Sequence, residues 1–146
     1  MPSVLTQMVA RGLLGPSLVV AAAILVKGYT DVGDGFSAGV IVGLALAVRY
    51  VALGPAETER ELPILRYAPS GVAAGLLGSI AVGFGPVLVG DPPFTHVPGP
   101  GEDVVHIGSL ELITAVAFDV GVFVLVVSLL VLLLHHLSSL VQEPER

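Results

Sequence analysis

Two acidic residues, Glu111 and Asp119, lie beside and inside the longest apolar stretch of this 146-residue sequence. A carboxylate in the hydrocarbon layer of a membrane costs roughly 2.5 to 3.5 kcal/mol on insertion scales, so it requires a cationic partner, a wet cavity or a bound proton. On one helix, eight residues separate the two acids by about 12 Å, which permits a relay through water but no shared proton. The pair therefore predicts either the lining of an ion or proton path or a buried inter-helix contact. We favour the contact, because one intramembrane acid cannot by itself form a transmembrane path.

Asp34 and His106 stand next to apolar segments, where a side chain can meet an ion or a proton at the membrane surface. Asp34 precedes an apolar run, so we interpret it first as a helix cap and second as an ion contact. His106 is either a proton-entry group or a solvated polar residue, and we favour the second. The adjacent His135 and His136 would point about 100° apart on a helix, which makes a poor chelating pair. We predict no metal site and no catalytic residue.

The stretch DVGDGFSAGVIVG, residues 31–43, contains a match to a nucleotide-binding turn. Gly33, Gly35 and Ala38 fit the G-x-G-x-x-G/A fingerprint, and Glu57 follows at about the distance of a ribose-binding acid. That fingerprint requires a strand before the glycines and an amphipathic helix after them. Here an apolar segment of spanning length comes before, and a run that is apolar on every face comes after. We therefore reject a nucleotide site.

Glycines also recur at four-residue or eight-residue spacing in two segments, which would place them along ridges of helices. These helix-packing candidates are Gly35, Gly39, Gly43, Gly71, Gly75 and Gly83. Small residues at this spacing let two helix backbones approach closely in lipid, where packing and hydrogen bonds must replace a hydrophobic drive for association. The alternative is that glycine is simply commoner in membrane helices than in soluble ones.

The composition is that of a membrane protein. The chain is 54% hydrophobic and 12% charged, with a mean hydropathy of +0.94, whereas soluble domains carry about 25% charged residues. The absence of cysteine excludes disulfides, thiolate metal sites and haem-attachment motifs. The formal charge of −6 argues against a nucleic-acid partner. We expect no cofactor.

Four apolar segments approach or exceed the ~20 residues that a spanning helix requires. We place them at residues 4–26, 36–53, 68–90 and 107–137, and we predict an all-α membrane protein of one domain, residues 1–146. Asp119 then lies twelve residues into the last segment, about 18 Å from its start and near the bilayer middle. The first segment has the alternative of a signal peptide, with Ala21 and Ala23 in an A-x-A cleavage site.

The basic residues predict the orientation, because Lys and Arg are held on the cytoplasmic side during insertion. In a four-helix topology Lys27 falls on one side, and the other side carries Arg11, Arg49, Arg60, Arg66 and Arg146. We therefore predict that both termini are cytoplasmic and that Lys27 and Arg49 extend to the membrane surface at helix ends. The outward loop, residues 91–106, is rich in Pro and Gly, so we expect it to be irregular and ordered only against a partner.

Two stretches carry a resemblance to a known family. KGYTDVGDGFSAGVIVGLALAVRYVALG is similar to the region around the P-G-G-G-F-x-G-G signature of the MnhB (MrpB) component of the multisubunit Mrp-type cation/proton antiporters. GSLELITAVAFDVGVFVLVVSLLVLLL resembles that family's last helix, with its L-E-L-x-T-x-x-x-F-D-x-G-V pattern. Val32, Asp34 and Ala38 stand where the first signature has Pro, Gly and Gly. Over about residues 12–134, the sequence is identified as a divergent member.

The resemblance implies a small, four-helix, non-catalytic subunit of a bacterial plasma-membrane antiporter that exports Na⁺, or another monovalent cation, against incoming protons. The implied partners are the other subunits of the complex, the lipid bilayer, and Na⁺ and H⁺ as transported ions. In such assemblies the large antiporter-like subunits carry the proton-transfer lysines and glutamates, and the MnhB component is required for assembly. Glu111 and Asp119 would face a neighbouring subunit or a cavity.

Two alternatives remain open at this stage. One is the equivalent subunit of a membrane-bound hydrogenase or another complex-I-related assembly, which uses the same module beside redox subunits. The other is an independent homo-oligomeric channel or small transporter, which would need no other subunit.

Overall fold

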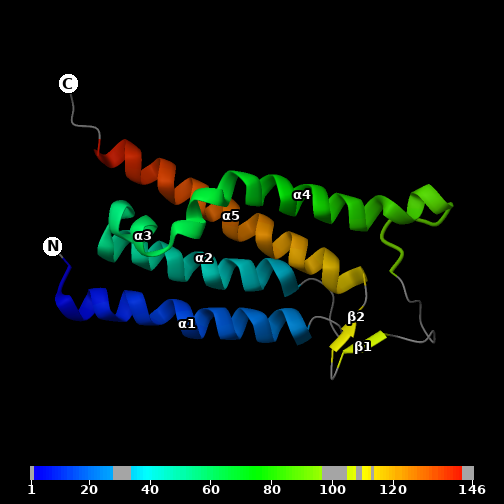
Figure 1. The fold of residues 1–146 in the computed structure, drawn as a ribbon, viewed down its shortest axis with the longest axis horizontal. Helices are drawn as coiled ribbons and strands as arrows, with labels where there is room; N and C mark the ends of the chain where they lie inside the picture. The colour runs from blue at the N-terminus through cyan, green and yellow to red at the C-terminus, as the bar shows by residue number, and fades with distance from the viewer. Residues whose placement is uncertain (1, 28–33, 97–104, 108–109, 113, 143–146) are drawn as a thin grey trace.

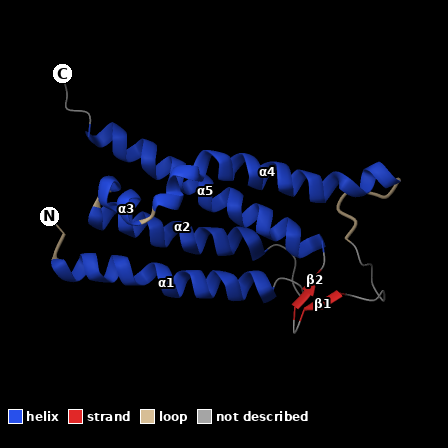
Figure 2. Ribbon diagram, in the orientation of Figure 1, coloured by secondary structure: helices blue, strands red, loops and turns tan. Residues whose placement is uncertain are grey.

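A computed structural model of the chain shows four long helices lying side by side (Figure 1). The structure describes residues 2–27, 34–96, 105–107, 110–112 and 114–142. The long helices are α1 (Val4–Lys27), α2 (Asp34–Leu53), α4 (Ala68–Phe84) and α5 (Thr114–Gln142). Shorter elements are α3 (Pro55–Glu61), η1 (Pro63–Tyr67), η2 (Gly85–Val89), β1 (Val105–Ile107) and β2 (Leu110–Leu112). Figure 2 separates the helices from the one small pair of strands among the described residues.

Among the residues that the structure describes, four helical segments are long and apolar enough to cross a membrane, which confirms the predicted all-α membrane fold. These spans are Val4–Val26, Asp34–Leu53, Pro63–Val89 and Thr114–Leu140. A helix satisfies its own backbone N–H and C=O groups, so a segment that is apolar on every face can enter lipid only in this form. The third span begins and ends with a 3₁₀ turn, η1 and η2, at either end of α4.

The helices form a row whose spatial order differs from their order in the sequence. The extensive contacts run from α1 to α2, from α2 to α5 and from α5 to α4. Figure 1 shows the same arrangement, with α1 and α4 at opposite edges. In the described part of the chain, α1 and α4 make no comparable contact, so the row stays open.

Glycines mark the line along which α2 meets α5. A Cβ atom on Gly35 would lie 2.2 Å from the backbone oxygen of Asp119, and one on Gly39 would lie 2.8 Å from the Cβ of Val126. Gly43 meets the side chain of Leu130 in the same way. Only hydrogen fits at these positions, which is how small residues bring two membrane helices together.

The contact between α4 and α5 uses the second set of glycines. A Cβ on Gly75 would lie 2.5 Å from the backbone nitrogen of Leu125, and one on Gly71 would meet the Ser128 hydroxyl at 2.1 Å. Gly83 differs from the prediction, because its neighbour is the ring of Phe94, which comes from the following loop and not from another long helix.

The predicted start of the fourth helix is wrong by several residues. Residues 105–107 and 110–112 form an antiparallel pair of short strands, and α5 begins only at Thr114. Asp119 is therefore the sixth residue of α5, about 7.5 Å from the start of the helix, and not near its middle.

The two ends of the row differ in character. The start of α1, the end of α5 and the short helix α3 lie together at one end, which we call the terminal end (Figure 1). The strands β1 and β2 lie at the other, which we call the hairpin end. Gly33 of the rejected nucleotide fingerprint and residues 97–104 of the predicted irregular loop fall outside the described residues.

The loop that follows η2 begins against its own chain, and not only against a partner as predicted. The Phe94 ring lies 5.5 Å from the ring of Phe84 and 5.8 Å from that of Phe118. The Phe94 N–H donates to the Gly83 carbonyl at 2.7 Å, and His96 Nδ1 lies 3.3 Å from the Thr114 hydroxyl. These contacts hold the described start of the loop to α4 and to the first turn of α5.

Candidate functional site

Asp119 is the most deeply buried acid among the described residues. Its exposed fraction is 2%, and it makes a polar interaction within the chain. Its backbone carbonyl lies directly against Gly35 of α2. The glycine is what allows α2 to come close enough to enclose this part of α5, because any Cβ would strike the carbonyl. Asp119 thus lies in a helix–helix contact inside the chain.

Asp34 lies at the same level of the row. It is the first residue of α2, directly before the glycine that contacts Asp119, and it is partly buried. A carboxylate in the first turn of a helix is stabilised by the partial positive charge of the helix N-terminus, typically by 0.3–1 kcal/mol at exposed positions. Asp34 therefore occupies a position at which an acid suits the start of the helix.

Glu111 and His106 belong to the hairpin. The strand register sets His106 opposite Glu111 at the level of their Cα atoms. Because Glu111 is in β2 and not in α5, the helical spacing assumed between it and Asp119 does not apply. Four of the predicted site residues therefore lie at the hairpin end: Asp34, His106, Glu111 and Asp119. No group of three His, Asp or Glu residues in the described segments could hold a metal ion.

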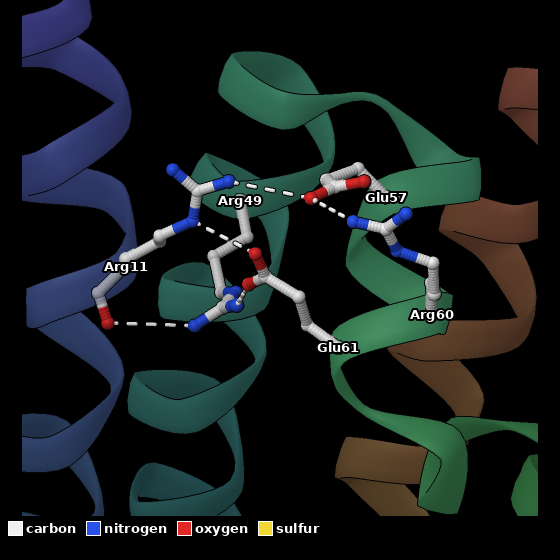
Figure 3. A network of polar contacts seen from close by, with 5 residues as sticks. All are labelled: Arg11, Arg49, Glu57, Arg60 and Glu61. Carbon is white, nitrogen blue, oxygen red and sulfur yellow. Dashed lines mark hydrogen bonds and ion pairs between the residues drawn. The ribbon is translucent and has the colours of Figure 1, made fainter.

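A network of ion pairs ties three helices together at the terminal end (Figure 3). Glu61 of α3 accepts hydrogen bonds from Arg11 Nε of α1, at 2.8 Å, and from Arg49 Nη2 of α2. Arg49 is only 5% exposed, and its Nη1 also donates to the backbone carbonyl of Arg11 at 3.4 Å. Glu57 pairs with Arg11 at 3.4 Å and with Arg60 at 2.9 Å. We call these five residues the arginine–glutamate network.

Glu59 extends the connection from α3 to α5. The Tyr50 hydroxyl donates to Glu59 Oε1 at 3.0 Å, and His135 Nδ1 lies 2.7 Å from the same oxygen. Tyr50 is buried in α2, whereas His135 is on the exposed last part of α5. The short helix α3 therefore contacts α1, α2 and α5 through three glutamates spaced two residues apart.

The hydrogen bond from Arg11 is the main reason that the pKa of Glu61 lies below its ordinary value of 4.5. Partial burial opposes this effect, and the positive charges of Arg11 and Arg49 add to it. Glu61 is accordingly ionised at neutral pH and pairs with two guanidinium groups.

The sequence is similar to those of known proteins. The sequence model of a family described as "Domain related to MnhB subunit of Na+/H+ antiporter" matches residues 5–132, which include all four spans for most of their length. The chain belongs to the MnhB family.

Two MnhB-type relatives are similar over most of both chains. The Na⁺/H⁺ antiporter B subunit of Alkalihalophilus pseudofirmus is 31% identical over 102 residues, which cover 70% of this chain and 69% of that protein. The Na⁺/H⁺ antiporter B subunit of Bacillus subtilis is 30% identical over 106 residues, 73% of this chain and 72% of that one. A probable K⁺/H⁺ antiporter A/B subunit of Rhizobium meliloti is 34% identical over 119 residues, 80% of this chain but 11% of that much longer protein. This chain is a divergent member of the family.

The sequence did not reveal the partners of Arg49 in this MnhB-family chain. We predicted that Arg49 extends to the membrane surface, and the structure shows instead a buried guanidinium held by Glu61 and by the Arg11 carbonyl. A signal was present, because the second loop opens with Gly-Pro and continues with three glutamates and one arginine, which favours a short charged helix. Sequence spacing could not show that this helix folds back onto α1 and α2.

Proposed function

We propose that this chain is a non-catalytic integral-membrane subunit of a multisubunit Mrp-type antiporter of the bacterial plasma membrane. The complex would exchange a monovalent cation, Na⁺ in the first instance, for protons, and this chain would be required for its assembly. The names of the relatives support a subunit of such a complex. The assembly role rests on the shape of the chain.

The open row of helices is the observation that carries the assembly role. Half of the α2 span is buried within the chain, but only 11% of the α1 span, 17% of the third span and 11% of the α5 span. A transport path through one chain needs an enclosed interior, and few residues of the first, third and fourth spans are fully buried. The surface of these spans is suited to contact with neighbouring subunits and lipid.

The burial of Asp119 supports a role inside the chain. A carboxylate lining an ion path must be reached by the ion, whereas Asp119 is 2% exposed and engaged in a polar interaction within the chain. We therefore propose that Asp119 locks α5 to α2. Asp34, Glu111 and His106, at the hairpin end, are the remaining candidates for contact with an ion or a proton at the surface.

Reconstitution of the purified chain tests whether it transports on its own. We expect the chain alone in proteoliposomes to show no proton flux driven by a Na⁺ or K⁺ gradient. In membranes that express the remaining subunits without it, we expect the large complex to be missing from a native gel. Cation-driven proton flux by the chain alone would contradict the proposal and favour an independent transporter. Genes for nickel–iron and iron–sulfur proteins beside its own would favour a hydrogenase-type complex.

The proposed orientation predicts which end reacts with a reagent that cannot cross the membrane. Because the sequence contains no cysteine, single cysteines can be placed at Ser3, at the terminal end, and at Asp91, which directly follows η2 at the hairpin end. In intact cells we expect an impermeant maleimide to label Asp91→Cys and not Ser3→Cys. Permeabilised cells should label both, and the unaltered chain neither. Labelling of Ser3→Cys in intact cells would show that the orientation is opposite to the proposed one.

A further inference from the structure

An apolar groove of about 460 Å³ lies between the two edges of the helix row. Its lining includes Leu18 of α1, Leu46 of α2, Ala68 of α4 and Val127 of α5. Because α1 and α4 both line it without contacting each other extensively, the groove occupies the space that the open row leaves between them. Tyr67 and Ser128 supply the polar side chains of the lining.

The groove is lined almost entirely by apolar side chains and lies on a surface built from candidate membrane spans. An acyl chain of a membrane lipid matches such a lining, and the volume is large enough to hold one. A helix from another protein would also be apolar, so the charge beside the groove decides between the two occupants.

A cation lies beside one end of this groove. Tyr67 closes the lining at the terminal end, and the guanidinium of Arg66 lies 4.7 Å from the centre of its ring. Arg66 Nη2 donates to the Tyr67 hydroxyl at 2.8 Å, and the side chain is exposed. Arg11, Arg49 and Arg60 are paired with glutamates, but within the described residues Arg66 has no carboxylate partner. Among the residues that the structure describes, no acid neutralises this charge, and an anionic headgroup would complement it.

We propose that the groove binds one acyl chain of an anionic phospholipid, whose phosphate pairs with Arg66. The groove is an apolar site for the acyl chain. Arg66 supplies a positive charge for the phosphate at the level where η1 begins the span. Tyr67 connects the groove to Arg66. It lines the groove, and its hydroxyl group and ring face contact the guanidinium. Tyrosine and arginine at a span end are suited to the lipid headgroup layer.

Lipid retention by the full chain tests this site without reference to transport. The chain is placed in nanodiscs of equimolar phosphatidylglycerol and phosphatidylcholine with the same acyl chains, released into detergent, and analysed by native mass spectrometry. We expect one retained lipid, with about a fivefold preference for phosphatidylglycerol, the effect of one arginine near an anionic headgroup. Equal retention of the two lipids, or no retained lipid, would overturn the proposal.

Matched variants separate the two parts of the site. Arg66→Gln should abolish the preference and keep the lipid, whereas Arg60→Gln, an exposed arginine outside the groove, should behave as the unaltered chain. Leu18→Trp should fill the groove and prevent retention of either kind of lipid. Val19→Trp, on the exposed face beside it, should leave lipid retention unchanged. Circular dichroism checks that each variant is folded. Lipid retention unaffected by Leu18→Trp in a folded chain would place the lipid elsewhere.

Cross-linking in native membranes tests whether a protein, and not a lipid, occupies the groove. With no native cysteine, Leu18→Cys carries a single thiol in the groove. We expect a photoreactive cross-linker on this thiol to capture lipid. Capture of a second copy of this chain, or of a helix from another protein of the complex, would overturn the proposal.

Discussion

Replacing Gly35 with alanine is expected to force α2 away from α5 and to destabilise the folded chain strongly. The new Cβ would lie 2.2 Å from the backbone oxygen of Asp119 and 2.8 Å from its carbonyl carbon. A backbone cannot rotate out of the way as a side chain can, so the helices must separate. Overpacking of this kind typically costs about 1–3 kcal/mol. At roughly 4 °C per kcal/mol for a chain of this size, the midpoint of unfolding should fall by about 4–12 °C.

Gly78 offers a matched control for this substitution. It lies in α4, and a Cβ there would meet nothing within 4 Å. Because alanine is a better helix former than glycine by up to about 1 kcal/mol, Gly78→Ala should leave the midpoint unchanged or raise it. Thermal unfolding in detergent, followed by circular dichroism, compares the two variants. Equal midpoints for Gly35→Ala and Gly78→Ala would contradict the close packing of α2 on α5.

Removing the carboxylate of Glu61 is expected to leave the buried guanidinium of Arg49 without its acidic partner. Arg49 is 5% exposed, so water cannot solvate the charge left behind as it would at the surface. Glu61→Gln should therefore lower the unfolding midpoint much more than Arg49→Met, which removes the buried charge and leaves Glu61 paired with Arg11. The double variant should recover part of the loss. If the losses of the two single variants simply add in the double variant, the two residues are not coupled.

An exposed pair in the same network provides the control. Arg60 and Glu57 are bonded at 2.9 Å, but the Arg60 side chain is 76% exposed. Exposed ion pairs contribute about 0–1 kcal/mol, so Arg60→Gln should shift the midpoint little. A shift as large as that of Glu61→Gln would contradict the assignment of the effect to the burial of Arg49.

The pH dependence of the Glu61 effect follows from its lowered pKa. A carboxyl whose pKa is lower in the folded chain than its ordinary value of 4.5 stabilises the fold at every pH above that value. The contribution is lost as the pH falls through the lowered pKa. The difference in midpoint between Glu61→Gln and the unaltered chain should therefore be constant from pH 6 to pH 9 and shrink in acid. A difference that changes near neutral pH would point to another titrating group.

The long helices could be predicted because each coincides with a mainly apolar stretch of about spanning length. The residues 36–53 and 68–90, for example, have too few polar groups to be anything but spanning helices, and α2 and α4 appear there. The glycine spacing pointed to Gly35, Gly39 and Gly75, where a Cβ would come closer than 3.0 Å to an atom of α5. It could not show that α5 is the partner in each case, because one periodicity fits any neighbouring helix.

Two features depended on tertiary arrangement and could not be predicted. The start of α5 was misplaced because Leu110–Leu112 continues the apolar run, and a short apolar segment fits a strand as well as a helix. The burial of Arg49 depends on α3 folding back, which brings Glu61 twelve residues along the chain to the same guanidinium. The spacing of residues along the sequence shows neither where α5 begins nor where α3 folds back.

The most direct test of the account is the behaviour of Asp119→Asn in the whole complex, followed on a native gel and by cation-driven proton transport in membrane vesicles. The change keeps the shape of the side chain and removes its charge, so it weakens a buried polar contact without adding bulk. If Asp119 locks α5 to α2, the amount of assembled complex should fall, and transport should fall in proportion. A fully assembled complex that has lost transport would contradict the structural role and place Asp119 on the ion or proton path.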